Sequence, residues 1–93
     1  MTPEGRNVAY LKKAFKAIGG ECRKCHWEGR VGAPDILVLL KGRHFFIEVK
    51  APGKKPEKYQ EREIARLKSA GFAVYVVDSP EAIDNLIKSL NNG

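Results

Sequence analysis

The sequence predicts an α/β domain in which three strands form a meander and a helix crosses over to a fourth strand. Three observations predict this class. Apolar residues recur at helical spacing near both ends of the 93-residue chain. In the middle, two apolar strand segments are joined by a very short reversal. A further helical segment then separates this pair from one more apolar strand.

The first helix is predicted to begin at Thr2, a favoured N-cap residue, with Pro3 at the first helical position. Its apolar face follows from residues spaced three and four apart, which are Val8, Leu11, Phe15 and Ile18. The pair Gly19-Gly20 ends this helix. Residues 21–27 are predicted as a strand. Residues 28–34 contain two glycines and a proline, and we therefore expect a turn there.

An apolar hairpin forms the centre of the predicted sheet. Residues 35–40 form a strand whose uninterrupted apolar run, Ile36 to Leu40, indicates burial on both faces. Residues 41–43 make a tight reversal, and residues 44–50 form the returning strand. The length of the reversal stays open, and it decides which residues face each other across the hairpin.

The second half of the chain supplies the crossover. Residues 51–56 form a loop, and a second helix runs from Pro56 to Ala70, with Gly71 as its cap. Residues 72–77 form the fourth strand. A last helix starts at Ser79-Pro80, and its apolar side consists of Ile83, Leu86, Ile87 and Leu90. The predicted order is αβββαβα.

Composition limits the functions that this chain can have. We expect one domain spanning residues 1–93. A domain this short buries only about 60–65% of its unfolded surface, so its core is marginal and a homodimer is expected. The net charge of +6 favours nucleic acid as the partner. The longest apolar run is too short for a bilayer and the N-terminus lacks the features of a signal peptide, so we expect a cytoplasmic protein with no membrane partner.

The informative residues for chemistry are Asp35, Glu48 and Lys50. Glu48 and Lys50 are two apart on a strand, so their side chains share one face, while Phe45 and Val49 point to the other. If Lys41 and Gly42 are the loop residues, Asp35 faces Glu48; if the loop residues are Gly42 and Arg43, Asp35 faces Lys50. Either register places all three side chains on one face. A three-residue loop would turn Asp35 away.

Two carboxylates this close repel each other, and a hard cation relieves the repulsion. Mg²⁺ or Mn²⁺ prefers such oxygen ligands. Lys50 could then orient or deprotonate an attacking water, or neutralise charge on a phosphorane. The plain structural alternative is a surface salt bridge between Lys50 and a carboxylate on an exposed face. The pairing on adjacent antiparallel strands favours the catalytic interpretation.

Two helical residues could support the site. Glu4 lies on the apolar face of the first helix, where a carboxylate needs a partner such as a metal ion. Alternatively, it is a first-turn Glu that is favoured by the helix dipole and reaches solvent. Gln60 lies near the start of the second helix, on the face of Ile64 and Leu67. It could contact a metal-bound water or a phosphate, or it could be a buried amide bonded to backbone.

Several basic residues are candidates for phosphate contacts. Lys54 and Lys55 follow Lys50 in a loop beside the proposed site, and Arg23 and Arg30 precede Asp35 along a possible DNA path. A further basic stripe on the second helix lies opposite its apolar face, which favours a solvated surface; it consists of Lys58, Arg62 and Arg66. Trp27 and Tyr59 could stack on bases, but we expect both to pack in the core.

The segment Cys22-Arg23-Lys24-Cys25-His26 has the spacing of a c-type haem attachment site. No export signal is recognised, the only methionine is Met1, and the segment is predicted as a strand. A zinc site would need four ligands, and only His44 remains as another soft one. We therefore interpret this spacing as coincidental.

The combined pattern resembles a known family. The order αβββαβ with Gly32-Ala33-Pro34-Asp35, then Glu48-Val49-Lys50 and then Gln60 is similar to the virus-type replication-repair nuclease (VRR-NUC) domain of the PD-(D/E)XK superfamily. The resemblance covers Thr2 to about Val77. It implies a restriction-endonuclease-like α/β fold with a mixed central sheet flanked by helices. It also implies a metal site made by Glu4, Asp35, Glu48 and the Val49 carbonyl, with Lys50 catalytic and Gln60 assisting.

The resemblance also implies a function. Stand-alone members are similar to phage and bacterial proteins that resemble Holliday-junction resolvases, which act as dimers on branched DNA. We therefore expect an endodeoxyribonuclease that uses Mg²⁺ or Mn²⁺ and cuts branched DNA such as junctions or flaps. The alternative is a non-catalytic basic module that binds nucleic acid on the same fold. Because a binding module has no need of Asp35, Glu48 and Lys50 together, their presence favours the enzyme.

Overall fold

The structure, a computed structural model, describes residues 1–91 and confirms the α/β class. The elements in chain order are α1 (Pro3–Ala17), β1 (Glu21–Lys24), β2 (Ile36–Leu40), β3 (Arg43–Val49), α2 (Lys58–Ser69), β4 (Val74–Val77) and α3 (Pro80–Asn91). The predicted start of α1 is confirmed, because the Thr2 hydroxyl accepts a hydrogen bond from the Gly5 amide at 3.0 Å. No helix within these residues has the length and apolar character needed to cross a membrane.

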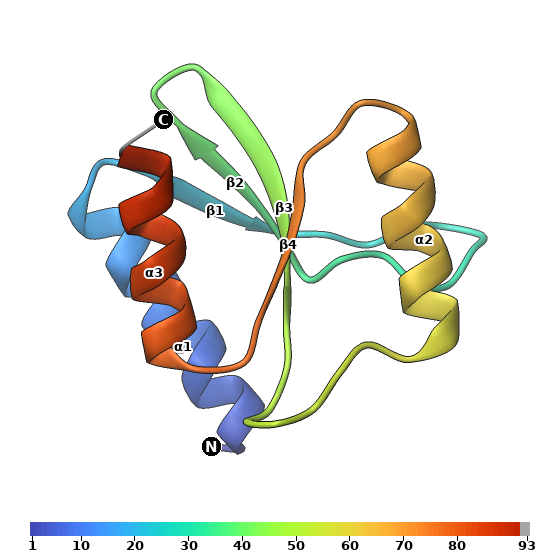
Figure 1. Cartoon of the computed structure of the whole chain (residues 1–93), viewed down its shortest axis with the longest axis horizontal. Helices are drawn as coiled ribbons and strands as arrows, with labels where there is room; N and C mark the ends of the chain where they lie inside the picture. Colours follow the sequence, from blue (N-terminus) through green and yellow to red (C-terminus); the bar gives the residue numbers. More distant parts are fainter. Residues whose placement is uncertain (92–93) are drawn as a thin grey trace.

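The four strands form one mixed sheet in the order β1-β2-β3-β4. The first three run antiparallel to their neighbours, and β4 lies parallel to β3. Helix α2 is the crossover between these two parallel strands. Helices α1 and α3 cover one face of the sheet and α2 lies on the other (Figure 1). The restriction-endonuclease-like layering that was expected, a mixed sheet flanked by helices, is therefore present.

The hairpin between β2 and β3 has the first of the two registers considered above. Leu40 pairs with Arg43, so Lys41 and Gly42 are the loop residues. Their φ angles of 50° and 78° are both positive, as a two-residue type I′ turn requires. Ile36 pairs with Ile47, and the next residues outward on the two strands are Asp35 and Glu48. The alternative register, with Gly42 and Arg43 in the loop, is wrong.

Each face of the sheet has its own apolar cluster. The larger lies under α1 and α3 and contains Phe15, Phe45 and Ile47, which are fully or almost fully buried. The smaller lies under α2 around Phe46 and Ile64, with Trp27 packed against it. The expected core role of Trp27 is thus confirmed. The same expectation for Tyr59 is wrong, because its side chain is 47% exposed.

Three predicted boundaries differ from the structure by two residues or more. Strand β1 ends at Lys24 rather than at residue 27, since the Cys25 amide bonds to the Asp35 carbonyl at 2.9 Å and the chain then leaves the sheet. Helix α2 begins at Lys58 rather than at residue 56, because Glu57 is its N-cap. Strand β4 begins at Val74 rather than at residue 72, since the Phe72 amide still bonds to a carbonyl in the last turn of α2.

The two cysteines do not form a common site. Cys22 packs against the larger apolar cluster and Cys25 against the smaller one, so they lie on opposite faces of the sheet. Both are free thiols. This placement supports the interpretation that the haem-like spacing is coincidental.

Candidate active site

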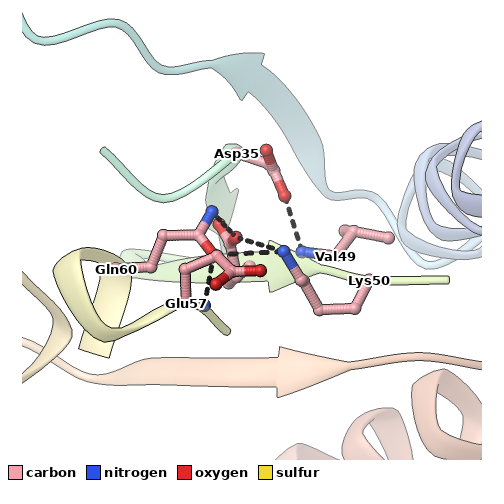
Figure 2. A network of polar contacts seen from close by, with 6 residues as sticks. Asp35, Val49, Lys50, Glu57 and Gln60 are labelled. Carbon is pink, nitrogen blue, oxygen red and sulfur yellow. Dashed lines mark hydrogen bonds and ion pairs between the residues drawn. The ribbon is translucent and has the colours of Figure 1, made fainter. Parts of the chain in front are cut away.

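The candidate site lies where the carboxyl end of β3 meets the start of β2 and the first turn of α2. Glu48 lies near the end of β3, Lys50 directly follows that strand, Asp35 directly precedes β2, and Gln60 lies in the first turn of α2. Figure 2 shows Asp35, Lys50 and Gln60 converging on this end of the strand. The predicted constellation is therefore brought together, and its members come from three elements of the fold.

Asp35 is held by the backbone of the neighbouring strand. Its Oδ2 accepts a hydrogen bond from the Val49 amide at 2.7 Å, which Figure 2 shows as a dashed line. Its own carbonyl accepts from the Cys25 amide at 2.9 Å. These two bonds tie the start of β2 to β3 and to the end of β1. The Asp35 carboxylate is thereby fixed opposite Glu48.

Gln60 connects the other two members of the set. Its Nε2 donates to Glu48 Oε2 at 2.6 Å, and its Oε1 accepts from Lys50 Nζ at 3.1 Å. The same Oε1 also accepts from the backbone amide of Glu57 at 2.8 Å, which completes one half of a capping box. The bond to the Glu57 backbone agrees with the structural interpretation of Gln60, and its bonds to Glu48 and Lys50 place it in the site. Its contact with a metal-bound water or a phosphate stays a prediction.

The Lys50 side chain is mostly buried and lies beside the Glu48 carboxylate. Its Nζ lies 3.7 Å from Glu48 Oε2, and its side chain is only 14% exposed. Glu48 is 1% exposed. The alternative of a surface salt bridge on an exposed face does not describe this pair, because α2 and the loops around it cover that face (Figure 1).

Glu48 has an unusual electrostatic environment. Burial raises the pKa of its carboxyl to about 7 from an ordinary value of 4.5, and the charge of Asp35 adds to the rise while Lys50 opposes it. Its Oε1 is buried, and no donor within residues 1–91 meets hydrogen-bond geometry with it, although the Asp35 backbone amide lies close enough to oppose the rise in pKa. A buried acceptor without a donor is unfavourable, and a proton or a cation at this oxygen would relieve that cost.

The donor set of this site fits a hard divalent cation. Asp35 and Glu48 present facing carboxylates, and no donor that the structure describes bonds to Glu48 Oε1. Glu4 is not brought to them. It is exposed in the first turn of α1, and no group of three or more His, Cys, Asp or Glu side chains suited to a metal occurs in the described part of the chain. The proposed ligand roles of Glu4 and of the Val49 carbonyl stay predictions.

Comparison with known proteins agrees with this geometry. Residues 5–81 match the family model described as the VRR-NUC domain. The chain belongs to the VRR-NUC family. It is similar to a solved structure labelled "VRR_NUC domain", with 46% sequence identity and a TM-score of 0.90, over 95% of this chain and 97% of that one. It is also 42% identical to "Putative nuclease p44" of Acyrthosiphon pisum secondary endosymbiont phage 1, over 88% of each chain.

Asn7, which sequence reasoning missed, stabilises the backbone next to this VRR-NUC site. Asn7 on α1 is 4% exposed, and its Nδ2 donates to the Lys50 carbonyl at 2.9 Å and to the Asp78 carbonyl at 2.7 Å. It thus joins the chain at the ends of β3 and β4 beneath the site. The signal was present in the sequence, because Asn7 lies one helical turn before Leu11 on the apolar face and a buried amide there needs partners.

The residues predicted to contact DNA lie on three different segments around the candidate active site. Lys54 and Lys55 are exposed in the loop between β3 and α2 that begins after Lys50. Arg30 lies in the loop between β1 and β2 and is paired with the buried Glu63 at 3.1 Å. Arg23 lies on the edge strand β1, where it pairs with Glu21 at 2.6 Å and is separated from β3 by β2.

Proposed function

We propose that this VRR-NUC protein is a divalent-metal-dependent endodeoxyribonuclease that hydrolyses phosphodiester bonds, with a single nuclease domain in residues 1–93. The observation that supports it best is the pair of facing carboxylates, Asp35 and Glu48, in which one buried oxygen of Glu48 has no hydrogen-bond donor among residues 1–91. A module that only binds DNA gains nothing from such a pair, which repels phosphate and destabilises the fold.

Each residue of the proposed site has a distinct role. Asp35 and Glu48 would hold Mg²⁺ or Mn²⁺, with the Val49 carbonyl as a further predicted ligand; Glu4 was also predicted, but it lies apart from these two carboxylates in the structure. A bound ion of this kind lowers the pKa of a bound water and stabilises charge on a phosphate. As an ammonium, Lys50 would orient the attacking water or neutralise the developing phosphorane charge; as the neutral amine, it would deprotonate that water. Gln60 keeps Glu48 and Lys50 in a fixed relation, since it bonds to both.

The proposed substrate is branched DNA such as a Holliday junction or a flap. The positive net charge of +6 suits a polyanion, and the exposed Lys54 and Lys55 lie on the loop that leaves the site. A two-fold symmetric junction presents two equivalent strands, which matches a two-fold symmetric enzyme. The alternative, a basic nucleic-acid-binding module without activity, shares all of these features except the catalytic one.

A cleavage assay tests the proposal. We expect the protein to cut at least one DNA in a panel of labelled junctions, flaps, duplexes and single strands when Mg²⁺ or Mn²⁺ is present, and none in EDTA. Asp35→Asn is the matched control, because the amide oxygen can still accept the Val49 amide bond while one charge of the metal site is lost. If clean protein cuts no DNA in either metal, the catalytic proposal fails and the binding module becomes the better account.

We also expect a homodimer. The core of a 93-residue chain is marginal, and pairing of two copies would bury further apolar surface. Light scattering at micromolar concentration should give about twice the chain mass of 10.4 kDa. A mass equal to that of one chain, both with and without junction DNA, would rule the dimer out.

A further inference from the structure

A groove beside the active site lies between the loop of residues 25–34 and helix α2. Figure 1 shows this loop reaching across to the helix. It consists of two adjoining hollows of about 360 Å³ each, which share Arg30, Val31 and Tyr59 in their walls. The first hollow reaches Gln60 of the active site, and the second ends at Arg62 and Arg66. We call this surface the α2 groove.

The α2 groove is lined by arginine side chains, two of which form ion pairs with the buried Glu63. Glu63 is 5% exposed, and its Oε1 contacts Arg30 at 3.1 Å and Arg66 at 3.4 Å. The two arginine side chains nevertheless stay 51% and 61% exposed. With Arg62, three guanidinium groups surround the groove and Glu63 cancels one of the charges. Positioned guanidinium groups with free donors suit phosphate oxygens.

The wall of the groove is built by close packing of the loop on the helix. Gly32 has a φ of +94°, and a Cβ there would lie 2.9 Å from the Tyr59 carbonyl oxygen and 3.2 Å from Glu63 Cβ. Only glycine allows the loop to approach α2 this closely in this conformation. The position of Arg30 relative to Tyr59 is therefore set by the fold, and the groove is present before any ligand binds.

An aromatic ring lies among these arginines. Tyr59 is 47% exposed, and the neighbouring Val31 is 73% exposed. Both line the two hollows. Proteins that bind single strands combine a basic groove with exposed aromatic rings on which bases stack. The bases of a duplex already stack on one another and cannot reach such a ring, whereas an unpaired base can.

We propose that the α2 groove binds an unpaired stretch of DNA next to the scissile phosphate, with a base stacked on Tyr59 and the flanking phosphates on Arg30, Arg62 and Arg66. This rests on the proposed nuclease function, because Gln60 places the groove next to the reacting atoms. Among branched substrates, the groove would favour those that carry unpaired nucleotides, such as flaps, since these alone engage both the ring and the arginines.

Binding in Ca²⁺ tests the groove without cleavage. The probes are a duplex with a short unpaired segment and a fully paired duplex of the same length. Tyr59→Ala should weaken binding of the first by roughly 5- to 100-fold, the loss typical of one stacked base, and should change binding of the second little. Tyr59→Phe keeps the ring and should bind both as the wild type does. Arg62→Ala should lower the dependence of log affinity on log salt by about 0.7–0.9.

A second readout reports stacking directly. A 2-aminopurine base in the unpaired segment should lose fluorescence on binding to wild type and Tyr59→Phe but keep it with Tyr59→Ala. Tyr59 is a surface residue, and a melting curve of each variant will show that the fold is intact. Equal losses on paired and unpaired DNA would overturn the proposal, as would wild-type binding by both Tyr59→Ala and Arg62→Ala. If the protein cuts no DNA yet Tyr59→Ala behaves as expected, the groove stands and the nuclease proposal fails.

Discussion

Replacing Lys50 with alanine should reduce cleavage by about two to four orders of magnitude while leaving DNA affinity almost unchanged. The reason is the position of its ammonium group. Lys50 Nζ lies 3.7 Å from Glu48 Oε2 and 3.1 Å from Gln60 Oε1, and the side chain is 14% exposed. It can act on the reacting phosphate and water, but it contributes little to the long-range attraction of a duplex. Single-turnover cleavage in Mn²⁺ and binding in Ca²⁺ measure the two effects separately.

Lys55→Ala is the matched control for this prediction. Lys55 is exposed in the loop that follows Lys50, and a lysine that only contacts phosphate should behave differently. Its loss should weaken binding across all sequences and reduce the salt slope by about one, and cleavage should fall only as far as binding does. Should Lys50→Ala lose binding in proportion to cleavage while Lys55→Ala loses cleavage alone, the two roles have been assigned the wrong way round.

The elements of the fold were predictable because each has a local signature. Helix α1 begins at a Thr-Pro pair, and the apolar run of β2 marks a strand. The predicted burial of β2 on both faces is wrong, because Leu39 on its second face is 38% exposed. The segment after Lys24 was not predictable in the same way. Residues 25–27 alternate in polarity as a strand does, but the chain leaves the sheet there so that Gly32 can pack against α2. That contact joins residues far apart in sequence, and no local pattern reveals it.

The candidate site was predictable to the extent that it depends on strand geometry. The two-residue period places Glu48 and Lys50 together, and an even loop places Asp35 with them. Which even register forms was left open, because Lys41 adopts a positive φ that is uncommon for a residue other than glycine. Asn7 was missed since its partners are carbonyls near residues 50 and 78. The exposure of Tyr59 was also predicted wrongly. It depends on how the loop of residues 25–34 packs beside α2, and that contact has no local signature in the sequence.

The environment of Glu48 leads to a prediction about stability. Its pKa is about 7 in the folded protein and 4.5 ordinarily, so between these values the folded state keeps a proton that the unfolded state has released. Stability without metal should therefore fall as pH rises from about 4.5 to about 7, by about 3 kcal/mol in total. Glu48→Gln should remove this loss of stability, because glutamine does not ionise. Its amide oxygen can still accept the bond from Gln60, so the variant should melt on the order of 10 °C higher than wild type in EDTA at pH 8.

Melting curves with and without Mn²⁺ complete this test. Wild type should gain stability as Mn²⁺ is added, because the ion binds the folded state only, and Glu48→Gln should lose that gain. Glu63→Gln is the matched control, since Glu63 is a second buried glutamate but is held by Arg30 and Arg66. It should not be stabilised in EDTA, and it should keep the response to Mn²⁺. An unchanged Mn²⁺ response in Glu48→Gln would remove Glu48 from the ligand set, and a wild-type melting temperature that rises between pH 5 and 7 in EDTA would contradict the raised pKa.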